Sequence, residues 1–261
     1  MKLGLSSAAF YGRMETEEQA AHLTQFPVDC CEVFLQSRSE YTVDFGDLVR
    51  RNLGEIPCVS AHPKGTQFEW DLFGRSRRQV EDAFETFTGV CDAARAMGAQ
   101  YYVLHGPAGI SAPLEPGRIH NLKDTAARMQ EIASQRGIEV LWENVSWCAL
   151  RRAEDVEAMT VLLPTQRFVL DVKQAFRAGQ DPLEVLKAMG DRVAHVHVLD
   201  MTGEGELCLP GEGVADWQGI ARQLRDIGYQ GAVILEPYER QARDEAALVR
   251  SLAWLRSLLQ I

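Results

Sequence analysis

Six residues of the types that bind metal ions or transfer protons each follow a run of apolar residues. The runs YYVLH, IEVLWE, RFVLD and AVILE each carry one such residue at the last position. One charged strand end is common because strands run out into solvent, but six of them favour a shared site. In a barrel of parallel strands, these ends meet at one mouth, where catalytic residues gather. The six residues are His62, His105, Glu143, Asp171, His197 and Glu236.

The three carboxylates in this set predict a bound cation. Crowded carboxylates repel one another, so they must either raise their pKa values or bind a metal ion. Carboxylate oxygens with an imidazole suit Mn²⁺, Mg²⁺ or Co²⁺, and Zn²⁺ also accepts this set. No cysteine stands at a strand end, which argues against a sulfur-bound metal. We expect one divalent ion, with Mn²⁺ as the first choice.

Three further residues near these strand ends have two interpretations each. His195 and His197 are two residues apart and face the same side of their strand. His197 is nearer the strand end and is the better ligand, whereas we expect His195 to be a hydrogen-bonded core residue. Asp200 either orients His197 or is a solvated loop acid. Glu32, in the second apolar run, is either a site acid or part of a salt bridge at the rim.

Short apolar runs alternate with segments of helical periodicity along the whole chain. The expected strands are Leu3–Phe10, Cys30–Leu35, Pro57–His62, Tyr101–His105, Ile138–Glu143, Phe168–Asp171, Val193–Val198 and Ala232–Glu236. The clearest expected helices are Arg77–Met97, Ile119–Gln135, Pro182–Met189, Trp217–Ile227 and Ala246–Leu259. Strands that alternate with helices indicate a parallel sheet. Eight such strands in 261 residues favour an α/β fold with one (β/α)₈ TIM barrel over residues 1–261, as a single domain.

Glycine and proline mark the expected element boundaries. Asp181 reads as a helix N-cap, with Pro182 at the first helical position. Gly98 and Gly190 follow expected helices, where a left-handed residue ends many helices. Two long irregular stretches, 63–76 and 106–117, each follow a strand, so we expect both over the mouth of the barrel.

Composition excludes several classes of partner. The formal net charge is −10, which disfavours nucleic acid, because phosphate backbones need a basic surface. No stretch reaches the roughly 18 apolar residues that a membrane helix needs. The opening residues MKLGLSSAAF hold no apolar run long enough for a signal peptide. The six cysteines form no CxxC pair and suit a reducing compartment, so we expect a cytoplasmic protein. The sequence does not indicate the oligomeric state.

Seven segments resemble those of the xylose-isomerase-like TIM barrels. This group includes sugar phosphate isomerases and epimerases, ketose 3-epimerases, inosose dehydratases and zinc-dependent apurinic endonucleases. The resemblance spans all eight expected strands and implies four metal ligands, Glu143, Asp171, His197 and Glu236. It is specific for the fold and the metal site but leaves the substrate open. The segments are SAHP (60–63), VLHGP (103–107), WENVSW (142–147), VLDVKQAFRAG (169–179), HVHVLD (195–200), LPGEGVADW (209–217) and ILEPYE (234–239).

The sequence departs from this pattern in two places. Three residues after Asp171, where these relatives usually have histidine, stands Gln174, an amide that is a poor metal ligand. The endonucleases also carry an Asp-x-His pair after the seventh strand, and 207–213 holds neither residue type. A three-zinc cluster is therefore not expected. With the negative net charge, this argues against DNA repair.

The resemblance also implies a reaction. In the related epimerases, the metal holds a substrate carbonyl and a neighbouring hydroxyl, which acidifies the adjacent C–H. We expect a divalent-metal-dependent isomerase or epimerase of a sugar or sugar phosphate, in which a metal-stabilised enediolate forms during proton transfer. The resemblance makes Glu143 and Glu236 the acid–base pair, each also a metal ligand. A role as ligand alone remains open for either glutamate.

Five residues are expected to contact the substrate. The two histidines have packing as the plainer alternative, and the charged loop residues have solvation. Lys64 would bind a phosphate or carboxylate group, and Gln174 would hydrogen-bond a hydroxyl. The five are His62, Lys64, His105, Gln174 and Glu212.

Three other functions compete with the isomerase or epimerase reading. A dehydratase of an inosose or similar keto-polyol begins with the same proton abstraction and then expels a β-hydroxyl. An endonuclease that cleaves DNA needs ligands that are missing here. A sugar-binding barrel without catalysis would not need three convergent carboxylates.

Overall fold

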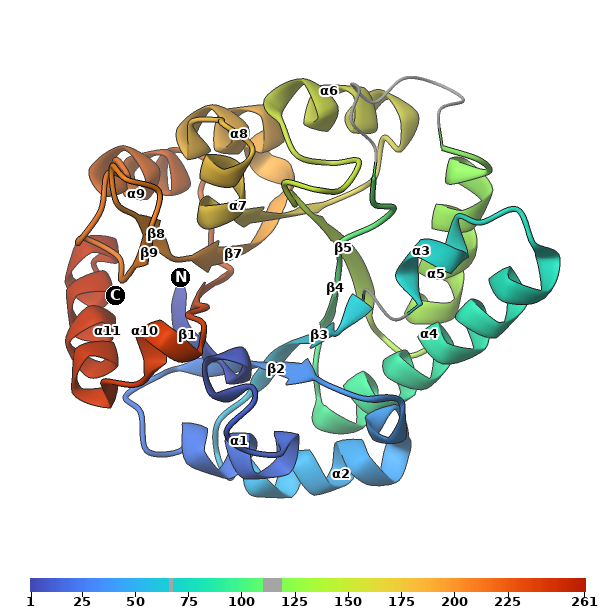
Figure 1. The fold of residues 1–261 in the computed structure, drawn as a ribbon, viewed down its shortest axis with the longest axis horizontal. Helices are drawn as coiled ribbons and strands as arrows, with labels where there is room; N and C mark the ends of the chain where they lie inside the picture. Colours follow the sequence, from blue (N-terminus) through green and yellow to red (C-terminus); the bar gives the residue numbers. More distant parts are fainter. Residues whose placement is uncertain (66–67, 110–118) are drawn as a thin grey trace.

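The computed structural model describes residues 1–65, 68–109 and 119–261. Eight parallel strands form a closed barrel in the order β1-β10-β7-β6-β5-β4-β3-β2, and helices form a ring around them (Figure 1). This confirms the predicted (β/α)₈ architecture. The strands are β1 (Lys2–Ser6), β2 (Cys30–Leu35), β3 (Cys58–Pro63), β4 (Tyr101–Leu104), β5 (Glu139–Glu143), β6 (Phe168–Asp171), β7 (Val193–Val198) and β10 (Ala232–Leu235).

The helices fall into two groups. The outer ring contains α1 (Thr16–Leu23), α2 (Val43–Asn52), α4 (Arg77–Met97), α5 (Leu122–Ser134), α6 (Ala153–Leu162), α8 (Pro182–Met189), α9 (Trp217–Asp226) and α11 (Glu245–Leu259). Short helices follow the carboxyl ends of three strands: α3 (Glu69–Leu72), α7 (Val172–Arg177) and α10 (Glu239–Ala242). A small antiparallel pair, β8 (Asp200–Met201) and β9 (Leu207–Cys208), follows β7.

Side-chain caps fix several helix starts near the barrel mouth. Asp181 caps α8 by accepting the N–H of Leu183, and Pro182 takes the first turn, as the sequence predicts. Asp171 ends β6 and also caps α7, because its Oδ1 accepts the N–H of Gln174 at 2.9 Å. The last strand residue and the first helical turn are therefore held as one rigid unit.

An apolar layer lies below the charged strand ends. Val103, Leu141, Val169 and Ala194, from four different strands, form one buried cluster. Side chains two residues apart in a strand share a face, so Leu141 lies below Glu143 and Val169 below Asp171. The polar residues at the mouth thus lie directly above a packed apolar layer.

The first strand is shorter than predicted. It ends at Ser6, and Ser7–Phe10 forms a 3₁₀ helix instead of continuing the strand. The Ser6 hydroxyl accepts the N–H of Ala8 at 3.3 Å, which turns the chain, and the apolar residues that follow are buried in the 3₁₀ helix. Of the two long stretches expected over the mouth, the first contains α3, while 110–117 of the second lie outside the described residues. None of the described helices is both long and apolar enough to cross a membrane.

Candidate metal centre and active site

Four side chains from four strands converge at the carboxyl end of the barrel. Each offers a ligating atom, and these atoms all lie within 4.8 Å of one another. All four side chains are buried, although three of them are carboxylates. The structure therefore brings together the four predicted ligands, Glu143, Asp171, His197 and Glu236.

The donor atoms of this cluster fit a divalent ion. His197 Nδ1 faces Glu143 Oε1 at 2.9 Å and Glu236 Oε2 at 3.5 Å. The other Glu143 oxygen, Oε2, is buried; His105 Nε2 lies 3.2 Å away, but the two atoms do not form a well-directed hydrogen bond. An unsatisfied carboxylate oxygen in a buried site is costly unless a cation binds it. Three carboxylates and one imidazole nitrogen form a donor set that Mn²⁺, Mg²⁺, Co²⁺ and Zn²⁺ accept.

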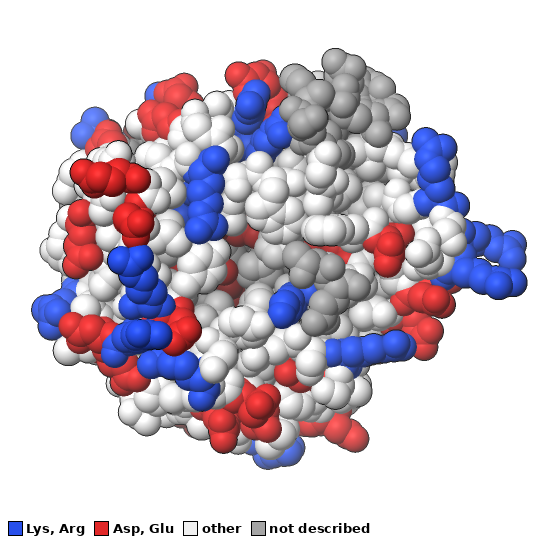
Figure 2. Space-filling model, viewed as in Figure 1, with Lys and Arg blue, Asp and Glu red and all other residues white. Residues whose placement is uncertain are grey.

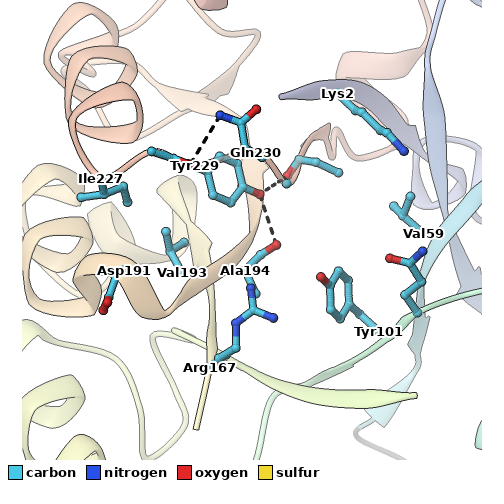
Figure 3. Close-up of a pocket in the computed structure, with 14 residues that line it drawn as sticks. Lys2, Val59, Tyr101, Arg167, Asp191, Val193, Ala194, Ile227, Tyr229 and Gln230 are labelled. Atoms are coloured by element: carbon cyan, nitrogen blue, oxygen red, sulfur yellow. Dashed lines mark hydrogen bonds between the residues drawn. The ribbon is translucent and has the colours of Figure 1, made fainter. Parts of the chain in front are cut away.

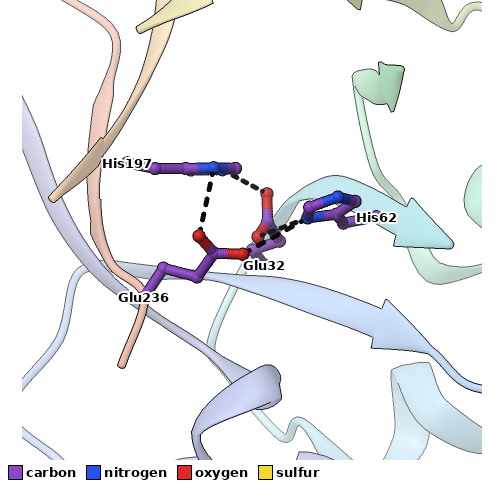
Figure 4. A group of neighbouring side chains, drawn as sticks. All are labelled: Glu32, His62, His197 and Glu236. Carbon is purple, nitrogen blue, oxygen red and sulfur yellow. Dashed lines mark hydrogen bonds and ion pairs between the residues drawn. The ribbon is translucent and has the colours of Figure 1, made fainter. Parts of the chain in front are cut away.

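Glu32 lies behind His197, inside the barrel. Its Oε2 is 2.9 Å from His197 Nε2 and accepts a hydrogen bond from the Ser60 hydroxyl, and its Oε1 accepts one from the Ser6 hydroxyl. Figure 4 shows its carboxylate between the His197 and His62 rings. Burial alone would raise the pKa of Glu32, but the surrounding histidines lower it well below its usual range. Glu32 is thus a buried acid that orients His197, and the rim salt bridge considered from the sequence is not formed.

His195 lies one layer deeper, where the sequence analysis places a core histidine. It is fully buried, and its Nε2 is 3.2 Å from Ser60 Oγ and 3.3 Å from Glu32 Oε2. Burial lowers the pKa of His195. This histidine therefore packs below the metal cluster.

Asp200 organises the loop after β7 rather than His197. Its buried carboxylate accepts the N–H groups of Gly211 and Gly213, both at 3.2 Å, and the indole N–H of Trp217 at 2.6 Å. A Cβ on Gly213 would lie 2.4 Å from Asp200 Oδ1, so only glycine allows this close approach. The orienting role that the sequence offered to Asp200 belongs to Glu32.

His62 and His105 form a pair of imidazoles beside the cluster. Their Nε2 atoms are 2.9 Å apart, and His105 Nε2 lies 3.2 Å from Glu143 Oε2. Burial lowers the pKa of His62, but the Glu236 and Glu32 carboxylates outweigh it and raise this pKa to about 10. His62 is therefore placed as a positively charged group at the cavity wall.

Glu69, which the sequence analysis missed, supports His105 from behind. Its Oε2 accepts the N–H of His105 at 3.1 Å, and its Oε1 accepts the hydroxyl of Tyr102 at 2.8 Å. Burial raises the pKa of Glu69. No strand pattern precedes this residue, so only its position in the long stretch 63–76 pointed towards the mouth.

Lys173, the second missed residue, lies among the ligands themselves. Its ammonium donates hydrogen bonds to Asp171 Oδ2 and Glu236 Oε2, and the side chain is only 2% exposed. Burial alone would lower the pKa of Lys173, but the two carboxylates raise it well above its usual value. In the sequence, Lys173 stands two residues after Asp171, and residues two apart in a helix do not lie on the same face. The sequence pattern therefore does not indicate that Lys173 belongs to the site.

The pKa values of the two carboxylates that Lys173 contacts are shifted in opposite directions. Burial raises the pKa of Asp171 to about 7, with Glu143 and Glu236 adding to the effect against Lys173. Burial also raises the pKa of Glu236, but Lys173 and His197 outweigh it and lower this pKa to about 2. Glu236 is thus the more firmly ionised of the pair.

A cavity of about 360 Å³ opens above the cluster. Figure 2 shows acidic side chains inside a hollow of this face and basic side chains beside it. Lys64 donates to the hydroxyl of Tyr11 at 2.8 Å, and Gln174 Oε1 accepts the Ser146 hydroxyl at 2.8 Å. The described lining includes Tyr11, Phe34, His62, Lys64, His105, Glu143, Trp147, Lys173, Gln174, Arg177, Glu236 and Tyr238.

Glu212 is the one predicted substrate contact that the structure does not bring to this cavity. It is exposed, and its carboxylate accepts the N–H of Leu209 at 3.3 Å. The hydrogen bonds from Gly211 and Gly213 to Asp200 hold its loop against β8, and Glu212 is not among the residues that line the cavity. We therefore do not retain Glu212 as a substrate contact.

A second cavity of about 360 Å³ lies at the opposite end of the barrel (Figure 3). It lies at the amino ends of the strands, where the Tyr229 hydroxyl donates to the carbonyl oxygens of Ala194 and Ala232. None of the groups of possible metal ligands among the described residues lies there. In barrels of this architecture, that end serves stability.

Curated relatives cover part of the chain at low identity. D-psicose 3-epimerase of Enterocloster bolteae is 28% identical over 129 residues, which are 47% of this chain and 40% of that enzyme. Fructoselysine 3-epimerase of Escherichia coli O157:H7 is 21% identical over 70% of this chain and 68% of its own length. Inosose dehydratase of Clostridium botulinum is 21% identical over 61% of this chain and 64% of that enzyme. The matches thus span 40% to 68% of these relatives.

Solved structures share the fold over nearly the whole chain. D-psicose 3-epimerase in the presence of D-fructose superposes with a TM-score of 0.73 at 17% identity, covering 99% of both chains. The IOLI protein with a bound zinc atom gives 0.75 at 16% identity, covering 99% of this chain and 96% of that one.

The sequence model of one family, described as the xylose isomerase-like TIM barrel, matches residues 22–258. This range includes the four converging ligands and seven of the eight barrel strands. The chain therefore belongs to the xylose isomerase-like TIM barrel family, as its strand-end residues predict.

Proposed function

We propose that this protein is a divalent-metal-dependent isomerase or epimerase of a small sugar or sugar phosphate. The observation that carries the proposal is the convergence of Glu143, Asp171, His197 and Glu236, two of which, Glu143 and Glu236, line a cavity of about 360 Å³. That volume suits a small-molecule ligand. The relatives named as 3-epimerases of psicose and fructoselysine support the same reaction class.

In the proposed mechanism, the two glutamates act in turn, one as the base that removes a proton from carbon and the other as the acid that supplies one. When bound, the metal would polarise a substrate carbonyl and acidify the C–H beside it. Glu143 Oε1 and Glu236 Oε2 both face His197 Nδ1, at 2.9 Å and 3.5 Å, so each glutamate presents a carboxylate oxygen to the cluster. One glutamate removes the proton from carbon, and the other group returns a proton to that carbon or its neighbour. Proton return from the other face of the same carbon gives epimerisation, and return to the next carbon gives isomerisation.

The cavity walls supply the proposed substrate contacts. The His62–His105 pair would hydrogen-bond hydroxyl groups near the reacting carbon. Gln174 would donate its amide N–H, because its carbonyl oxygen already accepts from Ser146. Lys64 lies further out, beside Tyr11, and would attract a phosphate or carboxylate at the far end of the substrate.

Dehydration of an inosose or similar keto-polyol is the second candidate. The match to inosose dehydratase favours it. Both reactions begin with removal of the same kind of proton. They differ in whether a β-hydroxyl then leaves.

We further propose Mn²⁺ as the working metal, on the oxygen-rich donor set. We also propose that residues 1–261 form one domain and that the protein works in a reducing compartment, the cytoplasm. The free cysteines, five of them buried, support the reducing compartment.

The decisive experiment screens keto-sugars, sugar phosphates and inososes for deuterium uptake from solvent, by NMR with added Mn²⁺. Exchange at one carbon would identify both the substrate and the site of proton transfer, and loss of a hydroxyl would select the dehydratase. Asp171→Asn should abolish exchange and weaken Mn²⁺ binding sharply, because the ligand loses its charge but keeps its shape. Wild-type metal content of one equivalent is expected. Three equivalents of zinc, or full exchange by a metal-free enzyme, would contradict the proposal.

A further inference from the structure

Lys173 occupies a place that the proposed reaction does not use. Its ammonium lies between two of the four proposed metal ligands and donates to one oxygen of each, Asp171 Oδ2 and Glu236 Oε2. The other oxygen of Asp171 already accepts the N–H of Gln174 at 2.9 Å. Both oxygens of this carboxylate therefore have hydrogen-bond partners within the protein itself.

The ammonium also neutralises charge that would attract a metal. Glu143, Asp171, Glu236 and Glu32 bring four carboxylates into one buried region. Among the described residues, Lys173 is the lysine or arginine that contacts two of them. A fixed positive charge beside the cluster repels a second cation, and the repulsion is strong in a site from which water is largely excluded.

We propose that Lys173 is a built-in competitor for the divalent ion. This inference rests on the proposed metal centre and concerns its regulation. In the metal-free protein, the ammonium holds Asp171 and Glu236 together, so that the carboxylates stay assembled without an ion. When the ion binds, Lys173 gives up at least one of these carboxylates.

The cavity offers the displaced ammonium another position. The Tyr238 ring lines the same cavity, and its centroid is 5.5 Å from Lys173 Nζ. An aromatic face at this distance attracts a cation. A small rotation of the flexible lysine stem would move the ammonium from the carboxylates towards the ring. The metal site would then be one that fills and empties readily, rather than a permanently loaded one.

Removal of the ammonium tests the competition directly. Lys173→Met keeps an unbranched side chain without the charge, and its affinity for Mn²⁺ is measured by titration calorimetry on the metal-free protein. We expect the dissociation constant to fall at least tenfold relative to the wild type, with one ion per chain. Lys64→Met is the matched control, because Lys64 lines the same cavity but bonds Tyr11 instead of a carboxylate. Its Mn²⁺ affinity should stay within about twofold to threefold of the wild type, since the half-buried Lys64 charge contacts no carboxylate of the cluster and is partly screened by solvent.

The outcomes separate this inference from the proposed function. If the wild type binds Mn²⁺ and Lys173→Met binds it equally or more weakly, Lys173 supports the ligands and the competition is refuted. If neither protein binds Mn²⁺, the proposed metal centre fails as well. A crystal structure of the wild type with Mn²⁺ gives a second test that does not depend on the stability of the variant. We expect Nζ to have left Asp171 or Glu236, and retention of both contacts would overturn the inference.

Discussion

Glu32 Oε2 lies 2.9 Å from His197 Nε2, while the other ring nitrogen of His197 faces Glu143. A carboxylate on the far nitrogen fixes the orientation of a metal-binding imidazole and raises its basicity. Three strands that are distant in sequence, β2, β5 and β7, thus share one hydrogen-bonded row. The identity of the residue at position 32 should therefore matter to the metal centre, although Glu32 is not one of the four proposed ligands.

Glu32→Gln should weaken Mn²⁺ binding by about 10-fold to 100-fold, the usual effect of losing such a partner. The amide keeps the size of the side chain but removes the charge that orients His197. Titration calorimetry measures the change, and Glu204→Gln, in an exposed loop, is the matched control. Equal affinity in Glu32→Gln and the control would show that Glu32 only fills space.

Glu143→Gln and Glu236→Gln should each slow deuterium exchange into substrate by about 10²-fold to 10⁴-fold, as expected for loss of an acid–base group. The comparison is made with the metal content of each variant matched to the wild type, because both residues are also proposed ligands. Should both metal-loaded variants exchange at the wild-type rate, the proton is carried elsewhere. His105 and Lys64 would then be the next candidate bases.

Gln174→Ala should raise KM and leave kcat nearly unchanged, because it removes a contact made equally in the ground and transition states. Ser146→Ala serves as a graded comparison, since Ser146 holds the Gln174 carbonyl oxygen from the side away from the proposed substrate. It should shift KM in the same direction by a smaller factor. A loss confined to kcat in Gln174→Ala would assign this residue to the chemical step instead.

Glu69 should raise the free energy of unfolding of the wild type, compared with that of Glu69→Gln, as the pH falls. Burial raises its pKa in the folded protein, so between the unfolded and folded pKa values the folded state holds more protons. The free energy of unfolding then increases as pH falls through the folded pKa, and the gain levels off below about 4.3, the usual value for glutamate. The test compares unfolding of the wild type and Glu69→Gln in urea between pH 7.5 and 5.

In this comparison, the wild type should gain stability over Glu69→Gln as the pH is lowered. Glu204→Gln, treated in the same way, should show no such trend. A difference between wild type and Glu69→Gln that stays constant with pH would mean that Glu69 keeps an ordinary pKa.

The sequence predicts the site residues at strand ends better than the supporting residues that contact them. His62, Glu143, Asp171, His197 and Glu236 were found because each follows an apolar run, and parallel strands bring such ends together. Four of the eight predicted strands differ from the structure only by a residue at either end, which is the normal uncertainty of strand boundaries.

The supporting residues gave weaker signals for physical reasons. The position of Glu32 inside the barrel depends on a register shift between Cys31 and Glu32 that pairs it with Ser60, and register is a property of two strands together. Lys173 folds back from the first turn of α7 onto Asp171 and Glu236, a long-range contact that spacing along one element does not reveal. The sequence predicts a strand over Ser7–Phe10 because buried apolar residues look alike in a strand and in a 3₁₀ helix.

The pairing of β1 with β10 has a consequence for synthesis on the ribosome. Lys2–Leu5 pair with Ala232–Leu235, so the first strand made waits for the last one before the barrel can close. Until then, β1 has a free edge, and Glu32 and His62 are present without His197 and Glu236. The nascent chain therefore carries an open, aggregation-prone sheet edge until β10 has been made, and only then can it assemble the cluster of carboxylates and histidines.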